Sequence, residues 1–293
     1  MNWRKVKDKL AARSMLVVIA FANSIAFLIA LGLFIKSRPV LAKESIVDLI
    51  FSSTWAPLRG EFGFFPFIVG TIEVTLIAMV LTIPVCLLSA IYLSEYAHRL
   101  VREGVRLVVD IMAGIPSVLY GLWGILVIVP FVRNLGHALG HATTGYSLLS
   151  GGIILGMMVS PIIISVSLEV LRSVPMEARE ATLALGTTRW ETVKHVVLRV
   201  ARHGILSAIV LGFTRAFGET IAVLMIVGNV PKVPQSIFDP AYPLPALLAN
   251  NYGEMMSIPM YESALLFSAF ILLLVVSGFN LAAHITLLRT ERG

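Results

Sequence analysis

The sequence predicts an all-α integral membrane protein with six transmembrane helices, and three observations support this fold class. Hydrophobic residues make up 57% of the 293 residues and charged residues only 14%, whereas soluble domains carry about 25% charged residues. Six apolar segments are each long enough to supply the roughly 20 helical residues that cross a bilayer. The basic residues are concentrated between alternate segments, as is typical of multi-span membrane proteins.

The six segments are predicted to be helices because membrane-spanning strands are shorter and alternate in polarity. The first is longer than the apolar region of a signal peptide, about 7–15 residues, and is expected to remain in the membrane. Residues 1–13 form an amino-terminal segment, 14–66 the first transmembrane helix with an external loop, and 67–293 a core of five transmembrane helices. The predicted spans are Ser14–Ile35, Phe67–Leu93, Arg106–Phe131, Leu148–Leu171, Ile205–Gly228 and Tyr261–Leu288.

The distribution of Lys and Arg predicts that both termini are cytoplasmic. Sixteen of the 23 basic residues lie on the side of the termini, six lie on the other side, and Arg215 lies within a span. Positively charged loops stay in the cytoplasm, so the net charge of +6 reflects topology and no nucleic acid is expected. The aromatic residues before the second span are interpreted as anchors at the outer interface: Trp55, Phe62, Phe64, Phe65 and Phe67.

Several kinds of chemistry are not expected of this chain. Cys86 is the only cysteine, so it cannot build a disulfide framework or a Cys-based zinc site. His137 and His141 are four residues apart, but no third ligand is nearby, and no metal or cofactor is expected. The P-loop pattern Gly-x4-Gly-Lys-Ser/Thr is absent. The chain is therefore not expected to be an enzyme, and ATP hydrolysis would take place in a separate subunit.

The connection between the fourth and fifth spans is long, charged and helical in pattern. Pro175 is typical of a helix start, and Gly186 stands where that helix would end. Thr188 and Glu191 then form a capping box, Thr-x-x-Glu, that opens a second helix. The pattern predicts two helices joined at a glycine turn. By pattern alone, a docking element for a partner and an amphipathic helix on the membrane surface are both open.

The order of residues in this loop favours docking. It contains Glu180-Ala181-Thr182, three residues, Gly186, nine residues and then Val196-x-Leu198. This order resembles the EAA signature of ABC importer permeases, although Arg199 stands where proline is usual. The resemblance implies the MetI-like permease fold, with residues 67–293 as the permease core. It also implies a coupling loop at about 172–204 that seats on an ATPase subunit through Glu180, Ala181 and Gly186.

The fifth span carries two charges. Arg215 and Glu219 are four residues apart and are predicted to share a helix face in mid-span, where each charge costs about 2.5–3.5 kcal/mol. A structural ion pair between helices and a substrate path are both open from this pattern. Pro116 interrupts the third span and frees backbone groups there. These groups would line a path or mark a kink, and a helix break is the favoured interpretation.

The residues around Arg215 narrow the choice of importer family. Arg-Ala-x-Gly-Glu-Thr is followed by Ile-Ala-Val and by Gly228-Asn229, and this stretch resembles the C-type permease of the phosphate-specific (Pst) ABC importer. Trp55-x-Pro57 and Val174-Pro175 agree with the same family. The resemblance implies a permease of an ATP-driven phosphate importer with Arg215, Glu219 and Thr220 on the substrate path. An arginine can grip two phosphate oxygens, and Glu219 would position or gate Arg215 rather than bind phosphate.

The resemblance also implies the partners and the location of the chain. The expected partners are a second, A-type permease subunit, two copies of an ATPase subunit and an external phosphate-binding protein, in a prokaryotic plasma membrane. Three alternatives are open. The first is a permease for another oxyanion such as molybdate or sulfate. The second is a secondary transporter or channel, which would show inverted repeats. The third is a membrane-embedded enzyme, which would need a catalytic cluster, and none is evident in the sequence.

Overall fold

A computed structural model describes residues 3–291 and is helical almost throughout. One short antiparallel pair of strands, Trp55 opposite Phe62, interrupts the helices. Arg292, one of the sixteen basic residues counted on the side of the termini, lies outside the described residues. The elements are α1 (Trp3–Lys36), α2 (Arg38–Lys43), α3 (Ile46–Phe51), β1 (Trp55–Ala56), β2 (Glu61–Phe62), α4 (Phe65–Glu95), α5 (Arg99–Gly114), α6 (Ser117–Trp123), α7 (Val129–Ala138), α8 (Leu148–Ser173), α9 (Met176–Ala184), α10 (Arg189–Thr192), α11 (Leu198–Gly218), α12 (Ile221–Ile226), α13 (Leu244–Asn251) and α14 (Pro259–Glu291).

Six helical stretches in the described chain are long and apolar enough to cross a membrane, which confirms the predicted number of spans. Two differ in position from the prediction. The third was placed at 106–131, but Ile115 and Pro116 separate α5 from the apolar helix that follows. The fifth was placed at 205–228, but it begins earlier, because a π-helical turn joins α10 directly to α11, and it ends earlier, because α11 stops at Gly218. The six stretches are Lys7–Lys36, Phe65–Glu95, Ser117–Ala138, Leu148–Ser173, Arg189–Gly218 and Pro259–Leu287.

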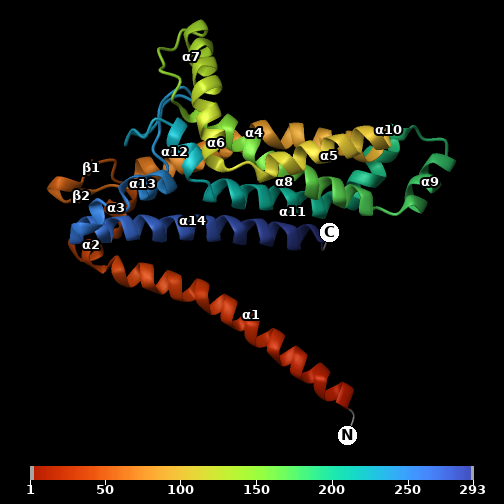
Figure 1. The fold of residues 1–293 in the computed structure, drawn as a ribbon, viewed down its shortest axis with the longest axis horizontal. Helices are drawn as coiled ribbons and strands as arrows, with labels where there is room; N and C mark the ends of the chain where they lie inside the picture. The colour runs from red at the N-terminus through yellow and green to blue at the C-terminus, as the bar shows by residue number, and fades with distance from the viewer. Residues whose placement is uncertain (1–2, 292–293) are drawn as a thin grey trace.

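Helices α4, α8, α11 and α14 run lengthwise beside one another and form the core of the bundle (Figure 1). Small residues bring α4 and α8 close together. A Cβ atom on Gly156 would lie 2.2 Å from Thr82 Oγ1, and one on Gly152 would lie 2.5 Å from Ile77 Cγ2. These glycines leave room for the neighbouring helix, because backbones approach closely where side chains are absent.

The aromatic residues before α4 are part of a buried cluster and not interfacial anchors, so that interpretation was wrong for most of them. Phe62, Phe64 and Phe67 are at most 2% exposed. Trp55 packs edge-on against all three rings, with centroids 4.8–5.8 Å apart. Rings from Tyr242, Tyr261 and Phe267 complete the cluster. They come from distant parts of the chain, where α13 and α14 meet the start of α4.

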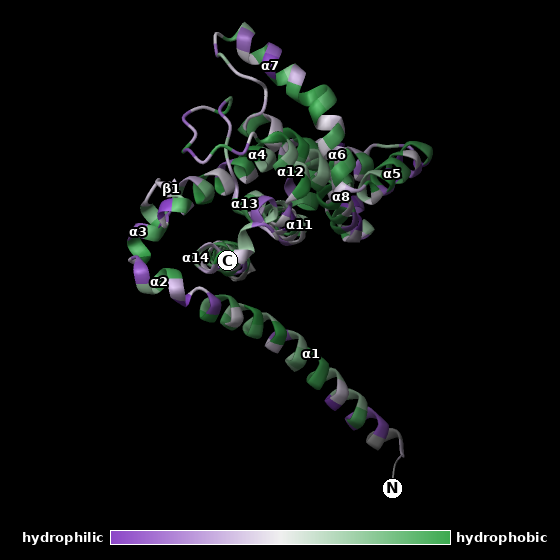
Figure 2. Ribbon diagram, turned by 60° about the vertical axis from the view of Figure 1, so that its left-hand side comes forward, coloured by the Kyte–Doolittle hydropathy of each residue, from purple (hydrophilic) through white to green (hydrophobic). Residues whose placement is uncertain are grey.

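Helix α1 is set apart from the bundle. Its 18 most apolar consecutive residues are not buried within the chain, and Figure 2 shows this largely hydrophobic helix leaving the other helices at an angle. Its last turns meet α14, where the Lys36 ammonium lies 3.4 Å from the Glu262 carboxylate. The start of α1, the end of α14 and helix α9 all lie toward the same end of the molecule (Figure 1). We call this the α9 end, and the opposite one the α13 end.

Candidate functional site

Two helix breaks meet around Arg215. Helix α5 ends at Gly114 and α6 begins at Ser117, with Pro116 between them. Helix α11 ends at Gly218, and α12 begins at Ile221. The Arg215 side chain lines a cavity of about 160 Å³ beside the first break. The other lining residues come from α5, α6, α8 and the Pro116 break: Met112, Ala113, Ile115, Tyr120, Met158, Pro161 and Ile162.

The break at Pro116 has a specific hydrogen bond behind it. Proline has no N–H, so the carbonyl of Met112 loses the partner that the fourth following residue provides in a helix. The Tyr120 hydroxyl donates to that carbonyl at 2.9 Å. The Ile115 N–H also reaches it, at 3.3 Å. The Tyr120 side chain of α6 thus holds the end of α5 in place beside the cavity.

Arg215 and Glu219 do not share a continuous helix, which corrects the geometry expected from their spacing. Glu219 follows the last helical residue, Gly218, and has an extended backbone (φ −76°, ψ 127°). Glycine is a poor helix former, and the helix ends at it. Within the described chain, neither carboxylate nor carbonyl forms an ion pair or hydrogen bond with the Arg215 guanidinium. Thr220 donates to the Gly218 carbonyl at 3.4 Å.

The loop between α8 and α11 has the predicted helix–turn–helix form. Helix α9 ends before Gly186, whose φ of +83° lies in the left-handed region that glycine enters without strain. The Thr188 hydroxyl accepts from the Glu191 N–H at 3.3 Å, and the Glu191 carboxylate accepts from the Thr188 N–H at 2.8 Å. This reciprocal capping box opens α10. Glu180, Ala181 and Gly186 are all exposed, as is Leu185 (84%).

Sequence reasoning missed the contact that anchors this loop. The Arg179 guanidinium of α9 lies 3.0 Å from the Glu95 carboxylate at the end of α4, and their side chains are only 13% and 9% exposed. Arg179 also donates to the carbonyls of Leu171 and Val174. Arg179 counted in the sequence only toward the positive charge of the loop. Nothing in a single sequence links two residues that are 84 positions apart.

The comparisons with known proteins agree with this architecture. The model of a family described as "binding-protein-dependent transport system inner membrane component" matches residues 83–287. The chain belongs to this family, as a multi-pass component of an inner membrane and not as a catalytic subunit.

Individual relatives are more specific. The chain is 35% identical over 261 residues to the phosphate transport system permease protein PstC of Xylella fastidiosa strain 9a5c, covering 84% of this chain and 80% of the relative. It is 32% identical over 273 residues to a probable PstC of Methanocaldococcus jannaschii, covering 87% and 86%. It is 35% identical over 262 residues to the probable ABC transporter permease YqgH of Bacillus subtilis, covering 89% and 83%. These matches confirm the resemblance to C-type Pst permeases.

A solved structure supports the fold. A chain of a bacterial alginate ABC transporter, solved in complex with an alginate pentasaccharide-bound periplasmic protein, superposes with a TM-score of 0.64. The superposition covers 96% of this chain and 95% of that one at 15% identity. The chain therefore has the ABC importer permease fold that the EAA-like loop implied.

Proposed function

We propose that this chain is the transmembrane permease of an ATP-driven phosphate importer, and that phosphate passes Arg215 on its way through the membrane. The observation that carries the proposal is the position of Arg215 in a cavity beside the Pro116 break, without a carboxylate partner among the described residues. A charge inside a membrane protein that has no partner marks a substrate pathway by default. The relatives whose names specify phosphate transport support the choice of substrate.

The chemistry of the segment suits an oxyanion. The planar guanidinium of Arg215 can offer two parallel N–H groups to two phosphate oxygens. Glu219 would repel phosphate if it stood at the same point. Because α11 ends at Gly218, the backbone of Glu219 leaves the helix face that carries Arg215. This placement fits a positioning or gating role for Glu219. Thr220, beside it, offers a hydroxyl to the path.

The proposal includes orientation and partners. With the excess of basic residues in the cytoplasm, the α9 end faces the ATPase, and both termini lie on that side. Glu180, Ala181 and Gly186 belong to the coupling loop that docks one of two ATPase copies. A second, A-type permease completes the membrane unit, and an external phosphate-binding protein delivers the substrate to the α13 end. Native mass spectrometry of the purified complex tests this composition.

Uptake by the assembled transporter in proteoliposomes tests the function. We expect ATP-dependent accumulation of radiolabelled phosphate that excess unlabelled phosphate abolishes and that sulfate and molybdate leave intact. Competition by sulfate or molybdate at equal concentration would instead assign the chain to another oxyanion importer. Accumulation without ATP would indicate a secondary transporter.

A further inference from the structure

A second and larger cavity, of about 870 Å³, lies between α5 and α8 toward the α9 end. It lies next to the cavity that Arg215 lines. Met112 and Ala113 of α5, with Pro161 and Ile162 of α8, line the Arg215 cavity. One helical turn farther along, Val109 and Asp110 of α5, with Ile164 and Ser165 of α8, line the second cavity. The two cavities therefore follow one another along the same pair of antiparallel helices.

Helix α5 presents a polar stripe to this groove. Its charged residues recur every three or four positions, which places them on one helix face over roughly 16 Å at 1.5 Å per residue. The opposite face is apolar and exposed, as expected of a helix that separates lipid from a polar groove. The polar stripe consists of Arg99, Arg102, Glu103, Arg106 and Asp110, and the apolar face includes Leu100, Leu107, Val108 and Ile111.

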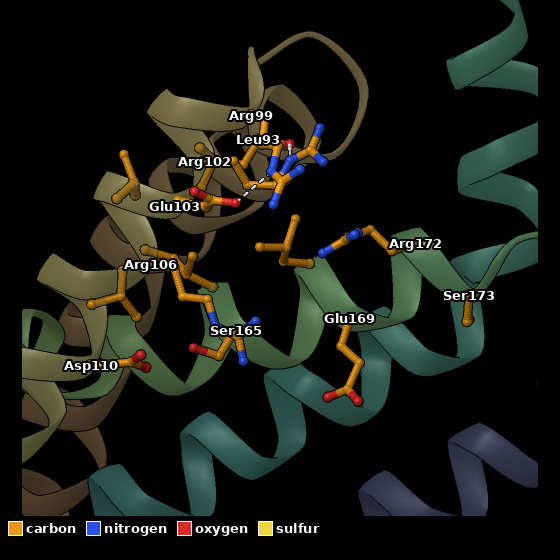
Figure 3. A pocket seen from close by; sticks show the side chains of 14 residues that line it. Leu93, Arg99, Arg102, Glu103, Arg106, Asp110, Ser165, Glu169, Arg172 and Ser173 are labelled. Atoms are coloured by element: carbon orange, nitrogen blue, oxygen red, sulfur yellow. Dashed lines mark hydrogen bonds and ion pairs between the residues drawn. The ribbon is translucent and has the colours of Figure 1, made fainter.

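Helix α8 faces this stripe with Ser165, Glu169 and Arg172. Figure 3 shows Arg172 reaching from α8 toward Arg99 and Arg102, and Arg106 reaching toward Ser165. The Glu169 carboxylate points to the other side. Guanidinium groups thus converge from both walls of the groove.

The positive charge in the groove is only partly compensated. Arg99 pairs with Glu103 at 2.7 Å. Arg102 donates to the carbonyls of Leu93 and Ala97 at the end of α4. These neutral acceptors fix the position of the Arg102 guanidinium but do not compensate its charge. Among the described residues, none forms an ion pair or hydrogen bond with the side chain of Arg106, Arg172 or Ser165.

We propose that this groove is a second anion-binding position, an exit station that holds phosphate between Arg215 and the α9 end. The inference rests on the proposed function and adds to it a second binding position. Arg106, Arg172 and the Ser165 hydroxyl hold the anion, and Arg102 adds an immobile positive charge. Conduction requires sites that attract an ion yet release it. Glu103 and Asp110, which also line the groove, lower the net positive charge and so favour release. The same chemistry would accept the phosphate of a lipid headgroup, and the test separates the two sources.

The test uses one introduced thiol in the complete transporter. Cys86 is the only native cysteine of the chain and is buried. Val105→Cys therefore places a single reporter thiol at a residue that lines the groove but takes no part in holding the anion. The complex is reconstituted in nanodiscs, and the rate at which an anionic thiosulfonate modifies this chain is measured by mass spectrometry. We expect phosphate at ten times its Kd to slow modification about tenfold. The protection should persist in the Arg215→Lys background, because phosphate enters the groove from the α9 end.

Two sets of variants and two lipid compositions make the result decisive. Arg106→Gln with Arg172→Gln should abolish protection, whereas Lys9→Gln with Arg13→Gln, which removes the same charge from exposed positions of α1, should preserve it. Protection by phosphate should be the same in zwitterionic and anionic nanodiscs. Slow modification in anionic nanodiscs without phosphate, and no response to added phosphate, would assign the groove to a lipid headgroup and overturn the exit station.

The outcomes also separate this inference from the proposed function. A transporter that imports phosphate while phosphate fails to protect the thiol contradicts only the exit station. A transporter that imports sulfate instead contradicts the proposed substrate. In that case sulfate replaces phosphate in the thiol-protection experiment. If sulfate fails to slow modification of the thiol, the exit station is wrong as well.

Discussion

The Arg179 guanidinium of α9 and the Glu95 carboxylate of α4 lie 3.0 Å apart and tie the loop between α8 and α11 to the second span. Ser94 donates to the same carboxylate at 2.8 Å, so the acceptor is fixed from its own helix as well. The loop is thereby anchored at its first helix, while the turn at Gly186 projects from the bundle. An exposed docking loop needs such an anchor if a force applied to it is to reach the membrane helices.

Breaking this pair should destabilise the transporter. Arg179→Gln leaves the Glu95 carboxylate without its cationic partner, and removing one member of a buried pair costs about 3–5 kcal/mol. We expect a clear loss of thermal stability, measured by gel filtration after heating, together with reduced phosphate uptake. Lys36→Gln removes one member of the largely exposed Lys36–Glu262 pair, far from the groove, and is the control, because exposed pairs contribute little. Equal effects of the two variants would contradict an anchoring role.

The turn at Gly186 should tolerate no β-branched side chain. A Cβ there would meet no atom within 4 Å, so any effect comes from the φ of +83° and not from a clash. Gly186→Val should reduce both ATPase co-purification and phosphate uptake while membrane insertion is retained. Gly140 offers a matched control, because it has a φ of +82° and equally open space but lies in the loop after α7. If Gly140→Val lowers co-purification as much, Gly186 is not the docking turn.

Substitution at Arg215 should separate a substrate contact from a structural charge. Arg215→Lys keeps the positive charge but loses the planar fork that fits two phosphate oxygens. We expect normal expression and assembly with uptake nearly lost. Arg215→Gln should abolish uptake as well. Wild-type uptake by Arg215→Lys would remove Arg215 from the substrate path.

The hydroxyl of Tyr120 should contribute to both thermal stability and phosphate uptake. Tyr120→Phe leaves the Met112 carbonyl with only the longer bond from Ile115, and the net loss of one hydrogen bond costs about 0.5–1.5 kcal/mol. We expect a lower thermal stability and slower uptake, because the end of α5 borders the Arg215 cavity. Tyr252→Phe is the control, since Tyr252 is 76% exposed. Unchanged uptake in Tyr120→Phe would show that the break at Pro116 needs no such support.

Local patterns in the sequence predicted the parts of this fold that depend on near neighbours. Hydropathy gave the six spans, and the Thr188–Glu191 spacing gave the cap of α10. The start of the third span was misplaced because α5 is half apolar and half polar, so its apolar half extends the hydrophobic run back across Pro116. The end of the fifth was misplaced because the apolar run continues through α12 after the helix has stopped at Gly218.

Contacts between distant residues could not be predicted in this way. Phe62 and Phe64 were assigned to the interface, because their partners Tyr261 and Phe267 lie about 200 positions away and nothing local marks them. The meeting of Arg215 with the Pro116 break was equally invisible, although each was singled out separately. The α5–α8 groove could not be predicted from the sequence either, because its two walls face each other only when both helices are packed.

The π-helical turn Val193–Val197 has a mechanical consequence. Because it joins α10 to α11 without a loop, one uninterrupted rod of 30 residues, Arg189–Gly218, runs about 45 Å from the capping box beside Gly186 to the helix end beside Arg215. If α9 docks an ATPase subunit as proposed, a displacement there is transmitted along this one helix toward Arg215. The wider turn at 193–197 is the natural place for that rod to flex, and its compliance would set how much of each ATPase stroke arrives at Arg215.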